Sequence, residues 1–501
     1  MSELRPTVLE AAAALRAGAT TSTALTAQVL ARADALDPRL GAFQARFDES
    51  ALGAAGEADA ELAAGVDRGP LHGIPIGIKD IIATAEGQTT AGSLVLDREW
   101  GRGRDAPVVT RLREAGAVIA GKLTTMEFAI GVPDPSKPFP VPRNPWDLGA
   151  WAGGSSSGAG NGVGAGLVLA ALGTDTGGSI RIPSAFCGLS GLVPTFGRVP
   201  KAGCVPLGYT LDHIGPIATS ARDCAALLGV IAGYDPSDPS SVRRAVPDYA
   251  GALRGSLEGV RIGVDREHHF PEASDPALAP CFDAALAAME ALGASISEVS
   301  LPCYEQMLVA NIVTIASESL AYHRRDLESR WEDYFAGTRN IFAQGAFITG
   351  ADYVQAQRAR RYAQRELAAL FAHVDVVVSP TTAIGAIPYD AFDGTRSSEL
   401  DALFQDLGSL FGLFFTPYWD CLGNPVLAAP IGFNAAGLPL SMQIAGRPFE
   451  EQAVLDVGAA YQSVTQWHEA LPPLLQELEP QPCGEPQSGS QRRPHEARGE
   501  L

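Results

Sequence analysis

The chain from residue 6 to residue 40 has a helical pattern of apolar positions. Apolar side chains recur there at intervals of three and four residues, at Leu25, Val29, Ala33 and Leu36. That spacing places them on one face of a helix, and the preceding pair Thr21–Ser22 is of the type that caps helix N-termini. The pattern therefore predicts an N-terminal helix that packs against the rest of the protein.

Short apolar runs alternate with helical stretches further along the chain. Five of these runs have the length of buried strands, at residues 74–78, 117–120, 167–172, 260–264 and 374–378. Alternation of strands and helices is typical of an α/β fold. The sequence therefore predicts a mixed, mainly parallel central sheet with helices on both faces.

Two regions depart from this alternation. Residues 302–420 have a more helical pattern, which predicts a cap on the sheet that shapes the substrate pocket. Residues 479–501 contain four prolines and no aromatic residue, so they have too little to bury and are predicted to be disordered. No Gly/Ser-rich linker divides the remaining chain, and residues 1–478 are predicted to form one domain.

Charge and composition exclude several classes of partner. The chain has 37 basic and 57 acidic residues, a net charge of −20, which repels polyanions unless a local basic patch reverses the field. The densest basic run, Arg358–Arg365, has the spacing of a solvated helix face. Nucleic acid is therefore not expected as a partner.

The distribution of cysteines and apolar residues bears on the compartment. Seven cysteines are scattered without a CxxC pair, which indicates reduced thiols and no zinc site. The N-terminus has no secretory pattern, and no run approaches the ~18 apolar residues of a membrane span. We expect a cytosolic, cytoplasmic protein with no metal and no membrane partner.

Candidate chemistry concentrates in two Gly/Ser-rich segments, 152–158 and 173–181, which a glycine-rich helix and a short strand connect. Each glycine inside a helix costs about 1 kcal/mol relative to alanine, so four of them require a close backbone approach. That packing is expected to bring the two segments together. Free amides beside a serine can then stabilise the oxyanion of acyl transfer.

A serine nucleophile needs a base, and none of the eight histidines lies in a strong local signature. Lys79 is the other candidate, because it directly follows the apolar run of residues 73–78 and so stands at the end of a predicted buried strand. Burial favours the neutral amine, and buried lysines reach pKa values of ~5–6. An isolated lysine is more often a surface residue, so the pattern alone leaves the base open.

These segments resemble the amidase signature family of serine hydrolases. The resemblance is carried by residues 69–80, by the serine-rich loop 153–158 and by residues 173–190, and it extends from about residue 8 to residue 470. The 24 residues that separate Ser155 from Ser179 also agree with the family. The resemblance implies the amidase signature fold.

The resemblance implies a Ser–cisSer–Lys triad. By position, Ser179 is the nucleophile, Ser155 is the bridging serine after a cis peptide bond, and Lys79 is the base. The oxyanion hole is implied to be the backbone amides of the loop that ends at the nucleophile, at Thr176, Gly177, Gly178 and Ser179.

The implied activity is hydrolysis of a small-molecule carboxylic amide through an acyl-enzyme, with esters and carbamates as further substrates. No cofactor is implied, and homodimers are common among similar enzymes. Met126 and Phe128 are predicted to line the pocket together with residues from 302–420. We expect a mostly apolar pocket that accepts aryl or medium-chain amides.

Two other motifs offer alternatives. Residues 154–158 satisfy Gly-x-Ser-x-Gly, the nucleophile elbow of α/β-hydrolase esterases, which would make Ser156 the nucleophile. Residues 160–165 fit Gly-x-Gly-x-x-Ala, a dinucleotide-binding pattern. Both motifs require a strand immediately before them, and the sequence predicts none there.

The glutaminase subunit of a tRNA-dependent amidotransferase is a third alternative, because it shares the implied fold and triad. Such subunits usually carry Ala-Ser-Ser-Leu-Asp-Gln before a Gly-Pro pair. This chain has Gly-Tyr-Thr-Leu-Asp-His at residues 208–213. The departure favours a free-standing amide hydrolase.

Overall fold

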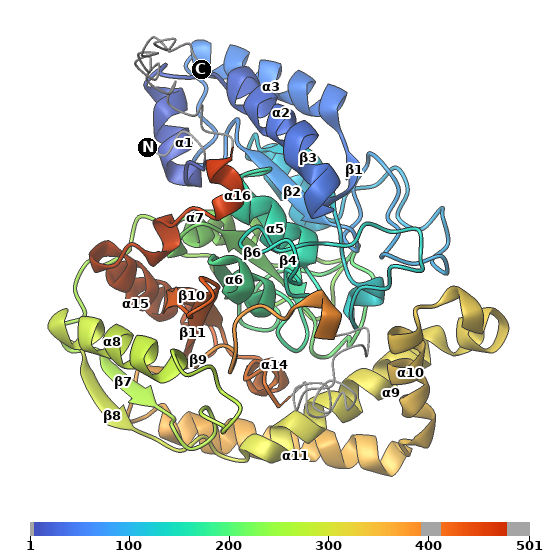
Figure 1. Ribbon diagram of the computed structural model, residues 1–501, viewed down its shortest axis with the longest axis vertical. Coiled ribbons are helices and arrows are strands. Elements are labelled where there is room, and N and C mark those ends of the chain that lie inside the picture. Colours follow the sequence, from blue (N-terminus) through green and yellow to red (C-terminus); the bar gives the residue numbers. More distant parts are fainter. Residues whose placement is uncertain (1–4, 392–411, 478–501) are drawn as a thin grey trace, which may run out of the picture.

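A central sheet of eleven strands organises the computed structural model, which describes residues 5–391 and 412–477 (Figure 1). The strands are β1 (Phe43–Arg46), β2 (Pro75–Lys79), β3 (Val118–Leu123), β4 (Ala170–Asp175), β5 (Ser190–Val193), β6 (His213–Ala218), β7 (Arg261–Val264), β8 (Ser295–Glu298), β9 (Val376–Pro380), β10 (Val426–Phe433) and β11 (Pro439–Gly446). All five predicted strands are confirmed, as β2, β3, β4, β7 and β9.

The helices of the described ranges surround this sheet. They are α1 (Val8–Arg16), α2 (Ser22–Leu40), α3 (Asp48–Ala63), α4 (Pro107–Glu114), α5 (Ser157–Gly164), α6 (Arg181–Cys187), α7 (Ala221–Ile231), α8 (Leu278–Ala291), α9 (Tyr304–Arg330), α10 (Ala336–Gln344), α11 (Gly350–Leu370), α14 (Pro417–Leu422), α15 (Glu451–Val464) and α16 (Pro473–Gln476). No helix of the described ranges has the length and apolar character that crossing a bilayer requires.

The strand order is β1-β3-β2-β4-β6-β5-β10-β11-β9-β7-β8. Parallel pairing is concentrated in two blocks, β3-β2-β4 and β9-β7-β8, and the centre is antiparallel. β4 and β5 run in the same direction, as their helical connection through α6 requires, but β6 lies between them and is antiparallel to both. The mixed α/β fold is therefore confirmed.

Two apolar cores lie on opposite faces of the sheet. Ala170 and Leu172 of β4 belong to one core, whereas Ala171 between them belongs to the other, as the two-residue period of a strand requires. Helices α7, α8 and α15 contribute to the first core, and α5 contributes to the second. The sheet is therefore covered on both faces, as predicted.

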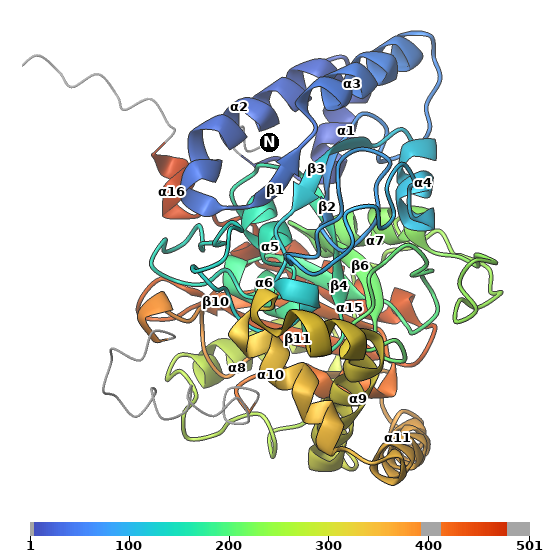
Figure 2. The ribbon, with the colours of Figure 1, turned by 90° about the vertical axis from the view of Figure 1, so that its right-hand side faces the viewer.

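The N-terminal helix and the helical cap occupy opposite ends of the molecule (Figures 1 and 2). The hydroxyl of Thr21 accepts a hydrogen bond from the amide of Ala24 and so begins α2 at Ser22, and this confirms the predicted helix. Helices α9, α10 and α11 form the cap. The predicted tail, residues 479–501, lies outside the described residues.

Within the described residues of region 302–420, helices occupy most of the chain up to Leu370, where α11 ends. Strand β9 follows, and Val376, Val377 and Val378 are fully buried in the sheet between β11 and β7. β-branched side chains that are buried on both faces favour a strand. The described part of region 302–420 is therefore not helical throughout, because β9 separates α9–α11 from α14, which begins at Pro417.

Candidate active site

Lys79, at the end of β2, is fully buried beside the two Gly/Ser-rich segments. Its Nζ donates hydrogen bonds to Ser155 Oγ and to Thr174 Oγ1, each at 2.7 Å. In the described part of the chain, no carboxylate forms a salt bridge with this amine. Lys79 is therefore connected to a hydroxyl relay and not to a counter-ion.

Burial lowers the pKa of Lys79 to about 7, although nearby acidic groups, among them Asp175 and Asp212, act in the opposite direction. Loss of hydration penalises the ammonium form more than the neutral amine. A substantial fraction of Lys79 is therefore neutral near pH 7 and able to accept a proton from Ser155.

The glycines of α5 allow the close backbone approach that the sequence predicts. A Cβ atom at Gly158 would lie 2.3 Å from the carbonyl oxygen of Ala42, and one at Gly160 would lie 2.8 Å from Pro183 Cβ. Real Cβ atoms do not tolerate such distances. Glycine is therefore required where α5 packs against the chain before β1 and against α6.

This packing brings the serine-rich loop and the loop after β4 together. The amide of Ser156 donates to the carbonyl of Ser179 at 3.2 Å, and the peptide bond between Gly154 and Ser155 is cis. Ser155 and Ser179 line one cavity of about 80 Å³. The predicted nucleophile and bridging serine therefore border the same space.

The lining of this catalytic cavity is uncharged. Its apolar part consists of Ala129, Ile130, Val132, Trp151, Ile182, Leu207, Ile315, Ile341 and Phe414. Its remaining side chains are those of Thr176, Asn311 and the two serines, and glycines complete the wall. A charged acyl group would therefore find no counter-ion among these residues.

The loop after β4 presents backbone amides next to Ser179. Gly178 donates its amide hydrogen to Asp175 Oδ1, which removes Gly178 from the predicted set of oxyanion donors. For the amides of Thr176, Gly177 and Ser179, the described ranges contain no hydrogen-bond acceptor. These three amides remain available to a substrate oxygen.

A buried ion network fixes the loop. Arg181 is fully buried and donates to Asp175 Oδ2 at 3.1 Å and to Asp420 Oδ2 at 2.5 Å. Burial acts to raise the pKa of Asp175, but the charge and hydrogen bonds of Arg181 outweigh it and leave that pKa lowered. Burial raises the pKa of Asp420 well above its ordinary value. Asp175 therefore stays ionised and holds the amides of Gly178 and Ile180.

The two residues predicted to line the pocket are core residues instead. Met126 is buried in an apolar cluster with Trp151 and Phe186, and a Cβ atom at Gly154 would lie 3.1 Å from its Cγ. The Phe128 ring contacts the rings of its aromatic neighbours His323, Tyr334 and Phe342. Neither Met126 nor Phe128 lines the catalytic cavity. Both side chains are close to the site along the chain, but they pack in the apolar core and do not face the substrate space.

Two residues that sequence reasoning missed hold the loop from distant elements. Asn311 in α9 donates to the carbonyl of Thr176 at 3.0 Å. Thr416, just before α14, donates to the carbonyl of Gly177 at 2.7 Å. They lie 135 and 239 residues from their partners along the chain, so no local pattern could have revealed them.

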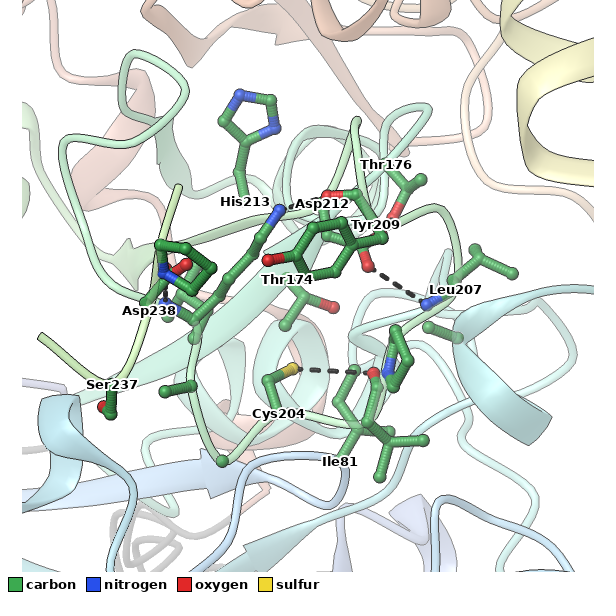
Figure 3. A pocket seen from close by; sticks show the side chains of 18 residues that line it. Ile81, Thr174, Thr176, Cys204, Leu207, Tyr209, Asp212, His213, Ser237 and Asp238 are labelled. Atoms are coloured by element: carbon green, nitrogen blue, oxygen red, sulfur yellow. Dashed lines mark hydrogen bonds between the residues drawn. The ribbon is translucent and has the colours of Figure 1, made fainter. Parts of the chain in front are cut away.

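A second cavity, of about 160 Å³, lies beside the catalytic cavity and shares Ala129, Thr176 and Leu207 with it (Figure 3). Tyr209 and His213 also line it. These two side chains stand where the sequence departs from the glutaminase pattern. The departure therefore lies beside the catalytic loop.

The polar side chains that line this second cavity interact with one another. Thr176 Oγ1 donates to Asp212 at 2.7 Å, and burial raises the pKa of Asp212. Burial lowers the pKa of His213 to about 4, so its imidazole is neutral at pH 7. The ammonium of Lys201 lies over the Tyr209 ring, 4.4 Å from its centroid. His213 does not line the catalytic cavity, and a pKa this low makes it a weak proton acceptor, so it is not a candidate for the catalytic base.

Comparison with known proteins identifies the family. A protein-family model described as Amidase matches residues 24–455. The chain belongs to the amidase family. It is therefore an amidase-family C–N hydrolase, and the resemblance that the sequence motifs indicated is confirmed at this level.

The similar proteins have several different names. The glutamyl-tRNA(Gln) amidotransferase A-subunit of Roseiflexus sp. (strain RS-1) is 41% identical, over 93% of this chain and 98% of that protein. The structure of an s-triazine catabolic enzyme, described with a vestigial protein complex, is 32% identical with a TM-score of 0.85, over 91% of this chain and 98% of that one. The peptide amidase from Stenotrophomonas maltophilia is 32% identical with a TM-score of 0.78, over 93% of this chain and 97% of that one. Amidase family membership therefore leaves the substrate open.

Proposed function

We propose that this protein hydrolyses neutral carboxylic amides whose acyl group is uncharged and mainly apolar, through an acyl-enzyme on Ser179. The observation that carries the proposal is the catalytic cavity, which Ser155 and Ser179 border and which no charged side chain lines. Burying an unpaired charge there would cost several kcal/mol, so a charged acyl group is excluded. Esters and carbamates with similar acyl groups fit the same site.

Acylation begins with neutral Lys79. The amine accepts the proton of Ser155, to which it is hydrogen-bonded, and Ser155 accepts the proton of Ser179. Ser179 Oγ then attacks the carbonyl carbon, and the amides of Thr176, Gly177 and Ser179 stabilise the oxyanion. Removal of one such donor typically costs ~10²–10³ in rate.

Breakdown of the tetrahedral intermediate uses the relay in reverse. The proton held by Lys79 returns through Ser155 to the leaving nitrogen, and the C–N bond breaks. A water molecule then gives its proton to the same relay and attacks the acyl-enzyme. The carboxylic acid leaves, and Ser179 regains its hydrogen.

Labelling with a fluorophosphonate tests this proposal. We expect peptide mass spectrometry to place the label on Ser179 and the Lys79→Ala variant to lose it, because the nucleophile then has no base. Label on Ser156 would support the α/β-hydrolase alternative and contradict the proposal. An unlabelled wild-type protein that hydrolyses no amide would contradict it as well.

The pH dependence follows from the lowered pKa of Lys79. The neutral amine is the active form, so we expect kcat/KM for a non-ionising amide to rise tenfold per pH unit below neutrality and to level off above a midpoint near pH 7. The measurement is a pH–rate profile between pH 5 and pH 9. A profile that is flat across pH 5–8 would contradict Lys79 as the base.

The glutaminase subunit of a tRNA-dependent amidotransferase is the second candidate, and the 41% identical Roseiflexus relative favours it. L-Glutamine carries an α-ammonium and an α-carboxylate. The residues that line the catalytic cavity provide no counter-ion for either group. We therefore expect kcat/KM for hexanamide to exceed that for L-glutamine by at least about 100-fold. Preference for L-glutamine, or copurification of further subunits, would favour the second candidate.

A further inference from the structure

A groove of about 520 Å³ lies between α11, the turn from α14 to β10 and the loop after β5. We call it the α11 groove; α11 and α14 lie side by side in Figure 1. It shares no lining residue with the two cavities beside the catalytic loop. The sequence pattern predicts a solvated helix face for the basic run Arg358–Arg365, but two of its arginines line this groove.

The charge of the α11 groove is opposite to that of the chain. None of its lining residues is acidic, although the protein has a net charge of −20. Arg361 is exposed and has no hydrogen-bond or ion-pair partner in the part of the chain that is described. Arg447 also lines the groove, but it is paired with Asp375 and Glu450. Arg361 is therefore a free cation at the groove.

Arg360 adds a second charge without a counter-ion. Its guanidinium donates to the carbonyl oxygens of Cys421 at 2.8 Å and Thr210 at 3.2 Å, and within the described ranges it contacts no carboxylate. Such a cluster of cations attracts an anion.

The rest of the groove lining includes an apolar, partly aromatic wall. It consists of Phe196, Leu367, Phe371, Leu422, Pro448 and Phe449. Phe449 has a φ of +66°, a left-handed conformation that is uncommon for a residue other than glycine, and its amide donates to Thr195 Oγ1 at 2.7 Å. A backbone held in this way is frequent at ligand sites.

We propose that the α11 groove binds an amphipathic anion, with its carboxylate or phosphate group at Arg360 and Arg361 and its aryl or alkyl body against the aromatic wall. Guanidinium groups match the geometry of both anions, and the groove has the size of small-molecule sites, ~300–1,000 Å³. The groove contains none of the proposed catalytic residues, and its ligand is not the proposed substrate.

Binding at this groove is connected to the catalytic loop. Arg360 donates to Thr210, and two residues further along Asp212 accepts from Thr176 Oγ1 at 2.7 Å. Thr176 lines the catalytic cavity. We expect an anion that draws Arg360 away from Thr210 to disturb the position of Thr176, whose amide is one of the three free donors, and so to lower kcat.

Calorimetric titration with 2-naphthylphosphonate, 2-naphthoate and 2-naphthylmethylamine tests the binding site. We expect the two anions to bind and the ammonium analogue not to bind. The R361Q variant should weaken anion binding about tenfold, because one charge-assisted contact is lost. The matched control R358Q, on the same helix but outside the groove, should bind like wild type. The stronger of the two anions identifies the anionic group.

Enzyme kinetics test whether anion binding in the α11 groove affects the catalytic loop. Saturating naphthylphosphonate should lower kcat about fivefold, with KM unchanged, in wild type and R358Q, and R361Q should require about tenfold more of the anion for the same effect. Equal binding of the anions by R361Q and wild type, or equal binding of the ammonium analogue, would overturn the site. Binding that raises KM alone would place the anion in the catalytic cavity and would also overturn it.

Discussion

The Ser179→Ala variant is expected to lose amide hydrolysis by a factor of about 10⁴–10⁶ in kcat, the range found when a nucleophile that works with its base as a unit is removed. Ser179 borders the catalytic cavity with Ser155, and without its hydroxyl no acyl-enzyme forms. The measurement is steady-state kinetics on hexanamide. Single-turnover experiments should also show that no acyl-enzyme accumulates.

Ser156→Ala is the matched control for this loss. Ser156 is fully buried, and its hydroxyl donates to the carbonyl of Thr174 and accepts from the amide of Thr174, each at 3.2 Å, so it has structural contacts but does not line the catalytic cavity. We expect its kcat to remain within about tenfold of wild type, because only two neutral hydrogen bonds to the backbone are lost. The reverse ranking, with Ser156→Ala inactive and Ser179→Ala active, would assign the nucleophile to Ser156.

Arg181→Met is expected to reduce the free energy of unfolding by about 3–5 kcal/mol, because it leaves buried carboxylates without their cation. Arg181, Asp175 and Asp420 are all fully buried or nearly so, and Arg181 also donates to the carbonyl of Thr416 at 2.9 Å. The measurement is urea unfolding followed by circular dichroism. The catalytic loop should be affected with the fold, because Asp175 orients two of its amides.

An exposed arginine provides the comparison. The side chains of Arg102 and Glu99 form a salt bridge at 2.6 Å in which both are 67% exposed. Arg102→Met should change the free energy of unfolding by less than about 1 kcal/mol, since solvent screens the pair. If Arg181→Met were as mild as Arg102→Met, the buried network would not be what holds the loop.

Local pattern was sufficient where one segment determines its own structure. The spacing of Leu25, Val29 and Ala33 predicts α2, and the cap at Thr21 marks its start. Residues 374–378 predict the strand β9 because β-branched side chains favour extended backbone. Local pattern could not place β6 between β4 and β5, because strand order depends on pairing between distant segments.

The candidate site divides in the same way. The glycines of α5 indicate from sequence alone that two loops meet, since glycine inside a helix is otherwise unfavourable. Sequence position assigns Met126 and Phe128 to the pocket, but the structure places them in packed clusters. An apolar side chain fits a core and a pocket equally well, so its sequence position does not distinguish the two.

Sequence alone was enough to predict five of the strands, the helix α2, the two Gly/Ser-rich loops and the candidates Lys79, Ser155 and Ser179. Each of these depends on residues that are neighbours along the chain or on motifs of fixed spacing. The folded structure was needed to show that Lys79 is desolvated, that Asn311 and Thr416 hold the catalytic loop, and that the residues lining the cavity are uncharged. Desolvation and cavity shape arise from surfaces contributed by segments up to hundreds of residues apart, and a linear pattern contains no record of which surfaces meet.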